Sequence, residues 1–168
     1  MAQHVENTSR FNVPAKKVWD VLNDFAAVAK FAPLIETSPL TNGQNSGIGA
    51  KRCCNFFDGT KIVEEIIELK EGESVTVVLT DHTMPLTSAI ATMKVVPIDA
   101  TTCDITIAMD YVVKGGPLGW LMGFFMMAPL MKGVFKKTSQ GLAYYSATGE
   151  PVGDGLPSKQ ALSLVVPA

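Results

Sequence analysis

Hydrophobic and polar residues alternate with a period of two through most of the middle of the chain. The alternating runs cover residues 46–57, 60–69, 74–80, 88–96 and 102–113, and short turns rich in Gly, Asp and Pro separate them. Such alternation is typical of strands that bury one face. Because no long crossover segment lies between consecutive runs, we expect antiparallel neighbours in one sheet.

The pattern changes to a helical one near the N-terminus. Val5–Val13 is predicted to be a first strand, and Pro14, which ends it, suits the first turn of a helix. Apolar residues recur at helical spacing over 18–25, while lysines and an aspartate occupy the opposite side. A second short helix is predicted over 26–32, and Pro33 stops it.

The least polar part of the chain, 115–137, predicts a long C-terminal helix. One stripe of the helical wheel is expected to face the sheet, namely Trp120, Phe124, Met127, Met131, Val134, Phe135, Thr138, Leu142 and Tyr145. Pro129 is expected to kink this helix. The uncharged part, 115–131, is about 17 residues long, at the lower limit for a transmembrane helix. Because strand-like segments precede it, we predict a helix of the folded domain and no transmembrane span.

The first half of this helix is apolar on its other side as well. That side carries Leu118, Leu121, Met122, Phe125 and Met126. A sheet covers only one side of a helix, so these residues need a second cover. We expect a homodimer through this surface, with the C-terminal tail as the alternative cover.

Composition narrows the classes of protein and partner. The chain has 168 residues, of which 47% are hydrophobic and 18% charged, with a net charge of −2. These values predict one folded domain, assigned to 1–149, followed by a tail over 150–168. They disfavour nucleic acid or an anionic membrane surface as the main partner, since either would usually select a basic stripe. The N-terminus lacks signal-peptide features and the three cysteines show no CxxC spacing, so we expect a cytoplasmic protein. Without metal-binding or nucleotide-binding motifs, no cofactor is expected.

Four segments together resemble a known superfamily: 13–33, 47–69, 84–97 and 116–142. They are similar to SRPBCC (START/Bet v 1-like) proteins, specifically the bacterial polyketide cyclase/dehydrase-like members. The resemblance implies an α+β helix-grip fold, in which a curved seven-stranded antiparallel sheet wraps around a long C-terminal helix, with two short helices after the first strand. It also implies a deep apolar cavity for a lipid, sterol or polyketide-like molecule. Only some members are enzymes, so catalysis stays open.

The most informative polar pair lies in the predicted hairpin around Asp58-Gly59. A three-residue loop places Arg52 opposite Glu64, whereas a two-residue turn places it opposite Glu65. In the first register the pair shares a face with apolar residues, as in a cavity wall, and the resemblance also favours Arg52 and Glu64. The pair is interpreted either as an anchor for a polar group of a ligand or as a structural salt bridge.

Other residues are weaker candidates for ligand contacts. The cavity-lining candidates are Trp19, Met93, Trp120, Phe124, Met127 and Met131. Tyr111 could direct its hydroxyl into the cavity, and His82 could act as a base at its mouth.

No catalytic residue can be assigned. We therefore predict binding of a small hydrophobic molecule; the alternatives are a cyclase or dehydratase acting on a carbonyl compound, and a module that docks to a protein or membrane interface through the start of the last helix.

Overall fold

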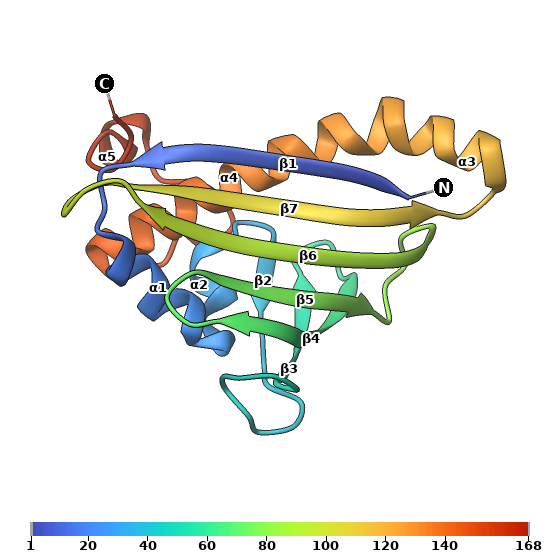
Figure 1. Ribbon diagram of the computed structural model, residues 1–168, viewed down its shortest axis with the longest axis horizontal. Coiled ribbons are helices and arrows are strands. Elements are labelled where there is room, and N and C mark those ends of the chain that lie inside the picture. Colours follow the sequence, from blue (N-terminus) through green and yellow to red (C-terminus); the bar gives the residue numbers. More distant parts are fainter. Residues whose placement is uncertain (1, 168) are drawn as a thin grey trace.

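One curved sheet of seven antiparallel strands dominates the structure, a computed structural model that describes residues 2–167 (Figure 1). Its strand order is β1-β7-β6-β5-β4-β3-β2, so strands that follow one another in sequence pair as hairpins and β1 closes against β7. The strands are β1 (Gln3–Phe11), β2 (Ile35–Thr37), β3 (Lys51–Phe56), β4 (Lys61–Lys70), β5 (Ser74–Thr80), β6 (Leu86–Pro97) and β7 (Cys103–Val113). The predicted sheet is confirmed.

Two short helices follow β1, as predicted, and a long helix follows β7. The short ones are α1 (Ala15–Asn23) and, after a 3₁₀ turn at Phe25–Ala27, α2 (Val28–Phe31). The long helix consists of α3 (Gly116–Met122), a π-helical turn (Gly123–Met127) and α4 (Ala128–Thr148). In Figure 1 it runs beside β1, and α3 lies at the end of the sheet away from α1 and α2. The α+β helix-grip fold is therefore confirmed.

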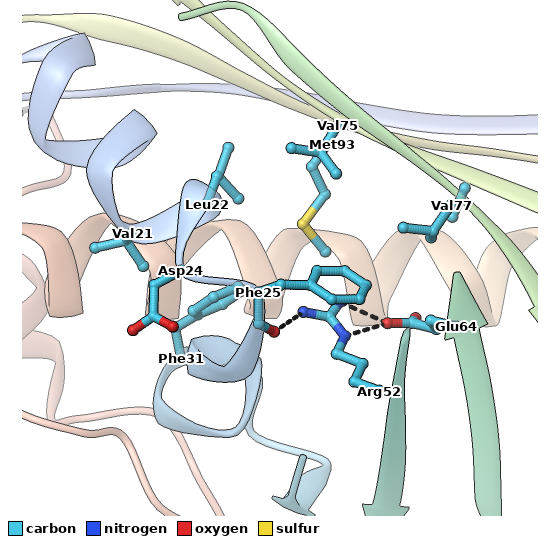
Figure 2. Close-up of a pocket in the computed structure, with 11 residues that line it drawn as sticks. Val21, Leu22, Asp24, Phe25, Phe31, Arg52, Glu64, Val75, Val77 and Met93 are labelled. Carbon is cyan, nitrogen blue, oxygen red and sulfur yellow. Dashed lines mark hydrogen bonds and ion pairs between the residues drawn. The ribbon is translucent and has the colours of Figure 1, made fainter. Parts of the chain in front are cut away.

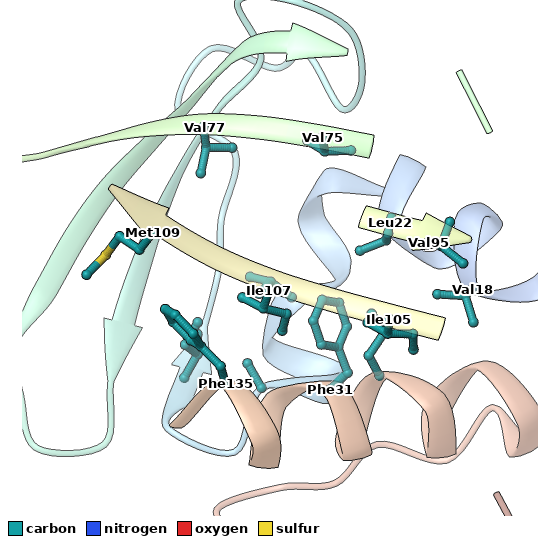
Figure 3. Packing of buried hydrophobic residues seen from close by; sticks show 14 of the residues in the cluster. Val18, Leu22, Phe31, Val75, Val77, Val95, Ile105, Ile107, Met109 and Phe135 are labelled. Atoms are coloured by element: carbon teal, nitrogen blue, oxygen red, sulfur yellow. The ribbon is translucent and has the colours of Figure 1, made fainter. Parts of the chain in front are cut away.

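The core lies between the concave face of the sheet and α4, with α1 and α2 closing one end. Every second residue of β7 is buried, from Cys103 to Val113, as strand alternation requires. Figure 3 shows Ile105 and Ile107 of this strand above α4, with Phe31 of α2 close to them and Phe135 extending from α4 itself. This packing orients the second half of the long helix.

A glycine lets α4 approach the end of α2 closely. A Cβ atom on Gly141 would overlap the carbonyl oxygen of Phe31, which is backbone and cannot turn aside. Only a residue without a side chain fits this contact. The spacing between α4 and α2 is therefore set at Gly141.

The π-helical turn lies directly before Pro129. Proline has no N–H, and in a regular α-helix its ring would clash with the carbonyl four residues earlier, that of Phe125. Here the N–H of Ala128 donates to the carbonyl oxygen of Gly123, five residues earlier. Such turns are one recognised cause of helix bending, which was the effect predicted for Pro129. The turn also shifts the register between the two halves of the helix.

The C-terminal tail folds back on its own chain. The N–H of Asn12 donates to the Val165 oxygen at 2.7 Å, and that of Val152 donates to the Lys30 oxygen at 3.0 Å. Leu162, in α5 (Lys159–Leu162), and Val165 are buried. Figure 1 shows α5 at the opposite end of the molecule from α3. The alternative in which the tail covers the start of the long helix of its own chain is therefore wrong.

Candidate functional site

Arg52 and Glu64 form a buried ion pair across β3 and β4. They are directly opposite in the strand register, and the guanidinium Nε and Nη2 lie 2.6 and 2.5 Å from Glu64 Oε2. Their side chains are 6% and 14% exposed. Glu65 faces the other side of the sheet, where it pairs with Lys51 at 3.0 Å. Of the two predicted registers, the one that pairs Arg52 with Glu64 is observed.

The protein itself holds the Arg52 guanidinium on three sides (Figure 2). Its Nη1 donates to the carbonyl oxygen of Phe25 at 2.6 Å, and its central carbon lies 3.9 Å from the centroid of the Phe25 ring. Glu64 occupies the remaining edge. Cation–π contact and paired hydrogen bonds stabilise a guanidinium away from water. Each of the three Arg52 guanidinium nitrogens therefore has a partner within the protein.

Glu64 is satisfied on only one of its two oxygens. Oε2 accepts from both Arg52 nitrogens and lies 3.5 Å from the Cys54 thiol. Burial, and then the nearby carboxylate charge, raise the pKa of the Cys54 thiol far above its ordinary value. Within residues 2–167, Oε1 has no hydrogen-bond partner. A carboxylate oxygen with free lone pairs is a ready acceptor for a donor on a ligand.

Two hollows meet at Glu64. The smaller, of about 30 Å³, lies against Arg52 and Phe25 and has room for about one water molecule. The larger, of about 170 Å³, lies between the sheet and α4. Glu64, Ala91 and Met93 line both. The Glu64 side chain thus lies between a small hollow that contains the Arg52 guanidinium and the larger apolar cavity.

The larger cavity is lined almost wholly by apolar side chains. Four of them are methionines from four different segments of the chain: Met84, Met93, Met109 and Met131. The remaining lining residues are Val28, Ala32, Leu34, Ile35, Phe56, Ile62, Glu64, Leu79, Ala91, Ile107, Val134, Phe135 and Thr138. Among them Glu64 is the one charged side chain. Thioether side chains are flexible, so this lining can adapt to ligands of different shape.

Some of the residues predicted to bind a ligand lie at this cavity and others do not. Glu64, Met93 and Met131 line it, Arg52 lines only the smaller hollow, and Met127 packs against the core without lining either. Met109 was missed although it shares the inward face of β7 with Tyr111. Met84 lies in the loop before β6, where no periodicity marks a residue as inward-facing.

Trp120 and Phe124 do not line the cavity, contrary to prediction. Their rings stack with centroids 5.7 Å apart, and Phe124 is 55% exposed. The prediction assumed one uninterrupted α-helix. The π-helical turn adds a residue to one turn and rotates the first half of the helix relative to the second. As a result Gly119 and Gly123 face the sheet in place of the aromatic rings.

The three remaining candidates have other partners or positions. Tyr111 is buried, and its hydroxyl donates to the Gly123 oxygen at 3.1 Å; burial raises its pKa. The indole N–H of Trp19 donates to Glu71 at 3.0 Å. His82 lines neither hollow. The structure therefore does not bring Tyr111 or His82 together with Glu64.

Among residues 2–167, no three His, Cys, Asp or Glu side chains are placed to hold a metal ion.

Sequence and structure comparisons identify the family. The family described as polyketide cyclase/dehydrase and lipid transport matches residues 2–146, so the chain belongs to it. This confirms the resemblance to SRPBCC proteins of the polyketide cyclase/dehydrase-like type. No curated protein sequence gives a significant match.

Solved structures with low sequence identity share the fold. The protein XoxI from Bacillus cereus has a TM-score of 0.71 at 18% identity, covering 86% of this chain and 96% of its own. A Thermobifida fusca protein has a TM-score of 0.69 at 22% identity, with 86% and 93% covered. Norcoclaurine synthase from Thalictrum flavum, in complex with dopamine and hydroxybenzaldehyde, has a TM-score of 0.60 at 17% identity, with 83% and 86% covered. Identities this low establish the fold alone.

Proposed function

We propose that the protein binds a small, neutral, mostly apolar molecule that carries a hydroxyl or similar donor group. The observation that carries this proposal is that Glu64, whose Oε1 has no hydrogen-bond partner within residues 2–167, lines the methionine-lined cavity. An apolar pocket with one placed polar group is the usual form of a small-molecule site. Family membership supports a ligand-binding or cyclase role in general.

The volume of the cavity limits the size of the ligand. An apolar cavity of roughly 150 Å³ is enough to bind benzene. The 170 Å³ cavity therefore accepts one or two aromatic rings or a short chain, with some movement of the methionines. Larger molecules, which need roughly 300 Å³ or more, require wider opening of the lining.

The charges at the site disfavour an anionic ligand. The Arg52 nitrogens that bind Glu64 and Phe25 lie outside the larger cavity. A ligand carboxylate would meet the like charge of Glu64, not the guanidinium. A hydroxyl group, by contrast, donates directly to Oε1.

A catalytic role receives less support from the geometry. Cyclisation or dehydration of a carbonyl compound needs groups that give and take protons at the substrate. Glu64 is the one ionisable side chain among the described residues that line the larger cavity. Tyr111 and His82, the other acid–base candidates, lie outside it. Binding is therefore the function that the site supports best, and cyclase chemistry is the second candidate.

Three matched ligands test this proposal. We expect 2-naphthol to bind more tightly than naphthalene, by about fivefold to tenfold, because of one hydrogen bond to Glu64. 2-Naphthoate should bind most weakly. Isothermal titration calorimetry gives the three dissociation constants. Preference for 2-naphthoate would make Arg52 the anchor, and absence of binding by all three would mean that the cavity is simply loose packing.

A pair of methionine substitutions provides the control. Met93→Trp should fill the cavity and abolish binding of 2-naphthol. Met126→Trp makes the same change on an exposed part of the long helix and should leave binding unchanged. If both variants bind normally, the ligand occupies another site.

A further inference from the structure

The first half of the long helix presents a large apolar surface to solvent. We call it the apolar helix surface; its members are Leu118, Leu121, Met122, Phe124, Phe125, Met126 and Leu130. Their side chains are between 38% and 78% exposed. Folded monomers seldom leave so many adjoining large apolar side chains in water without a partner.

The side of this helix that faces the sheet is fixed by two glycines. A Cβ atom on Gly119 would overlap the carbonyl of Lys114, and one on Gly123 would overlap Gln3 and Val113. Gln3 also donates from Nε2 to the carbonyl oxygen of Trp120 at 2.5 Å. The helix is therefore pinned to the ends of β1 and β7 through its small residues. Its large apolar residues are turned outward.

Charge is distributed unevenly around this surface. Between Asp110 and Glu150 the sequence has no acidic residue, and it has four lysines: Lys114, Lys132, Lys136 and Lys137. All four are exposed. The segment 111–149 therefore carries +4, and because the whole chain has a net charge of −2, the rest carries −6. Lysines lie at both ends of the apolar helix surface.

The helix 116–148 is long and apolar enough to cross a membrane by length and composition, but its position in the fold argues for a different arrangement. Only 17% of its most apolar window is buried, so this part is not a core helix. The exposed part, 116–131, is about 24 Å long, shorter than a hydrocarbon core of about 30 Å. From Phe135 onward the helix packs into the domain core. A helix fixed in this way can lie in a membrane interface but cannot span the bilayer.

We propose that the apolar helix surface docks to an anionic lipid membrane, a partner that the net charge of the whole chain disfavours but that the lysines of 111–149 support. Its apolar side chains would enter the boundary between headgroups and acyl chains, and the flanking lysines would contact anionic headgroups. Apolar burial combined with basic residues is the known basis of interfacial helix binding. This inference is independent of the ligand proposed for the cavity.

The same observations favour lipid over a second copy of the chain. A two-fold dimer through this surface would bring two sets of four lysines together, and 111–149 supplies no carboxylate to pair with them. An anionic membrane supplies the opposite charge along the whole surface. The homodimer predicted from the sequence is therefore the alternative that the experiment must exclude.

Docking in this way would place the cavity close to lipid. Met131 lines the cavity, while its neighbour Leu130 belongs to the apolar helix surface. The two apolar regions thus meet within one turn of the helix. A molecule dissolved in the membrane would have a short path to the cavity.

Vesicle binding tests the proposal on the full chain. Vesicles of phosphatidylcholine alone are compared with vesicles that also contain phosphatidylglycerol, at low and high salt. We expect the protein to float with the anionic vesicles only, and high salt to weaken this binding. Each change of Lys132, Lys136 or Lys137 to glutamine should lower the affinity for these vesicles about fivefold. Brominated acyl chains should quench Trp120, and Trp120→Phe should remove that quenching.

Two equally exposed residues provide a matched pair of variants. Phe125 and Ile48 are each 66% exposed, but only Phe125 belongs to the apolar helix surface. Phe125→Glu should reduce vesicle binding about tenfold or more, whereas Ile48→Glu should leave it unchanged. Circular dichroism checks that both variants fold.

Several results would overturn the proposal. Absence of binding to anionic vesicles would do so, as would equal binding by Phe125→Glu and the unaltered chain. A dimer seen by sedimentation equilibrium, dissociated by Phe125→Glu and unable to bind vesicles, would show that a second copy covers the surface instead.

Discussion

The two halves of the long helix have similar apolar side chains but opposite surroundings. In the second half Phe135, Leu142 and Tyr144 are buried against the sheet and the short helices. In the first half Leu118, Phe125 and Met126 are in contact with solvent. Hydrophobicity alone therefore does not tell which part of a helix is core. The deciding factor is how much of the rest of the chain lies beside it.

The difference follows from what each half packs against. The second half contacts α1, α2, β1 and β7, which together enclose it. The first half lies at the other end of the sheet, beyond α1 and α2, and contacts the end of β7 through glycines (Figure 1). No described segment reaches its outer side. The first half is available for a partner, while the second half forms the wall of the cavity.

Changing one leucine to alanine in each half of the helix should give the largest difference in the free energy of unfolding. Leu142 is fully buried, so Leu142→Ala removes core packing and should lower the free energy of unfolding by about 2–5 kcal/mol. Leu130 is 66% exposed, and Leu130→Ala should change the free energy of unfolding by less than about 0.5 kcal/mol. Urea unfolding of both variants measures the difference. A substantial loss for Leu130→Ala would mean that its surface is already covered in solution.

Glycine substitutions sharpen the comparison within the second half. Gly141→Ala forces a Cβ atom against the Phe31 carbonyl and should destabilise by about 1–3 kcal/mol. Gly133, on the exposed side one turn after Pro129, has no atom near its added Cβ. Gly133→Ala should stabilise by roughly 0.5–1 kcal/mol, because alanine favours the helix more than glycine. Thermal unfolding checks both; equal effects would contradict the close approach at Gly141.

Sequence reasoning predicted the fold well because the strand alternation and proline positions are local signals. The pairing of Arg52 with Glu64 was also within reach, since the turn at Asp58-Gly59 restricts the hairpin to two registers. Which of the two forms depends on the loop and the packing around it. Lys51 and Glu65 then lie together on the other face of the sheet, because successive side chains of a strand point to opposite faces.

The helical part of the site was harder to predict. A helical wheel assumes a constant 3.6-residue period, and the π-helical turn before Pro129 breaks that assumption. Trp120 and Phe124 were therefore assigned to the wrong side. The small-residue contacts of Gly119 and Gly123 depend on where β1 and β7 end, which is a tertiary property. Met84 lies in a loop and carries no periodic signal at all.

The smallest effect is expected at the junction between the two halves, where the Tyr111 hydroxyl donates to Gly123. Tyr111→Phe removes this hydrogen bond and should cost about 0.5–1.5 kcal/mol near neutral pH.

Because burial raises the pKa of the Tyr111 phenol, the folded state favours its neutral form. The neutral phenol therefore contributes fully to the free energy of unfolding below the unfolded pKa of about 10. This contribution is lost as the pH rises through the pKa of the folded state. Urea unfolding at about pH 8 and about pH 10.5 should therefore show a smaller difference between Tyr111→Phe and the unaltered chain at the higher pH. Comparison with the unaltered chain at the same pH cancels the titration of the other tyrosines and the lysines. A difference that does not change with pH would mean that the phenol is solvated and that the π-helical turn is held by Ala128 and Pro129 without it.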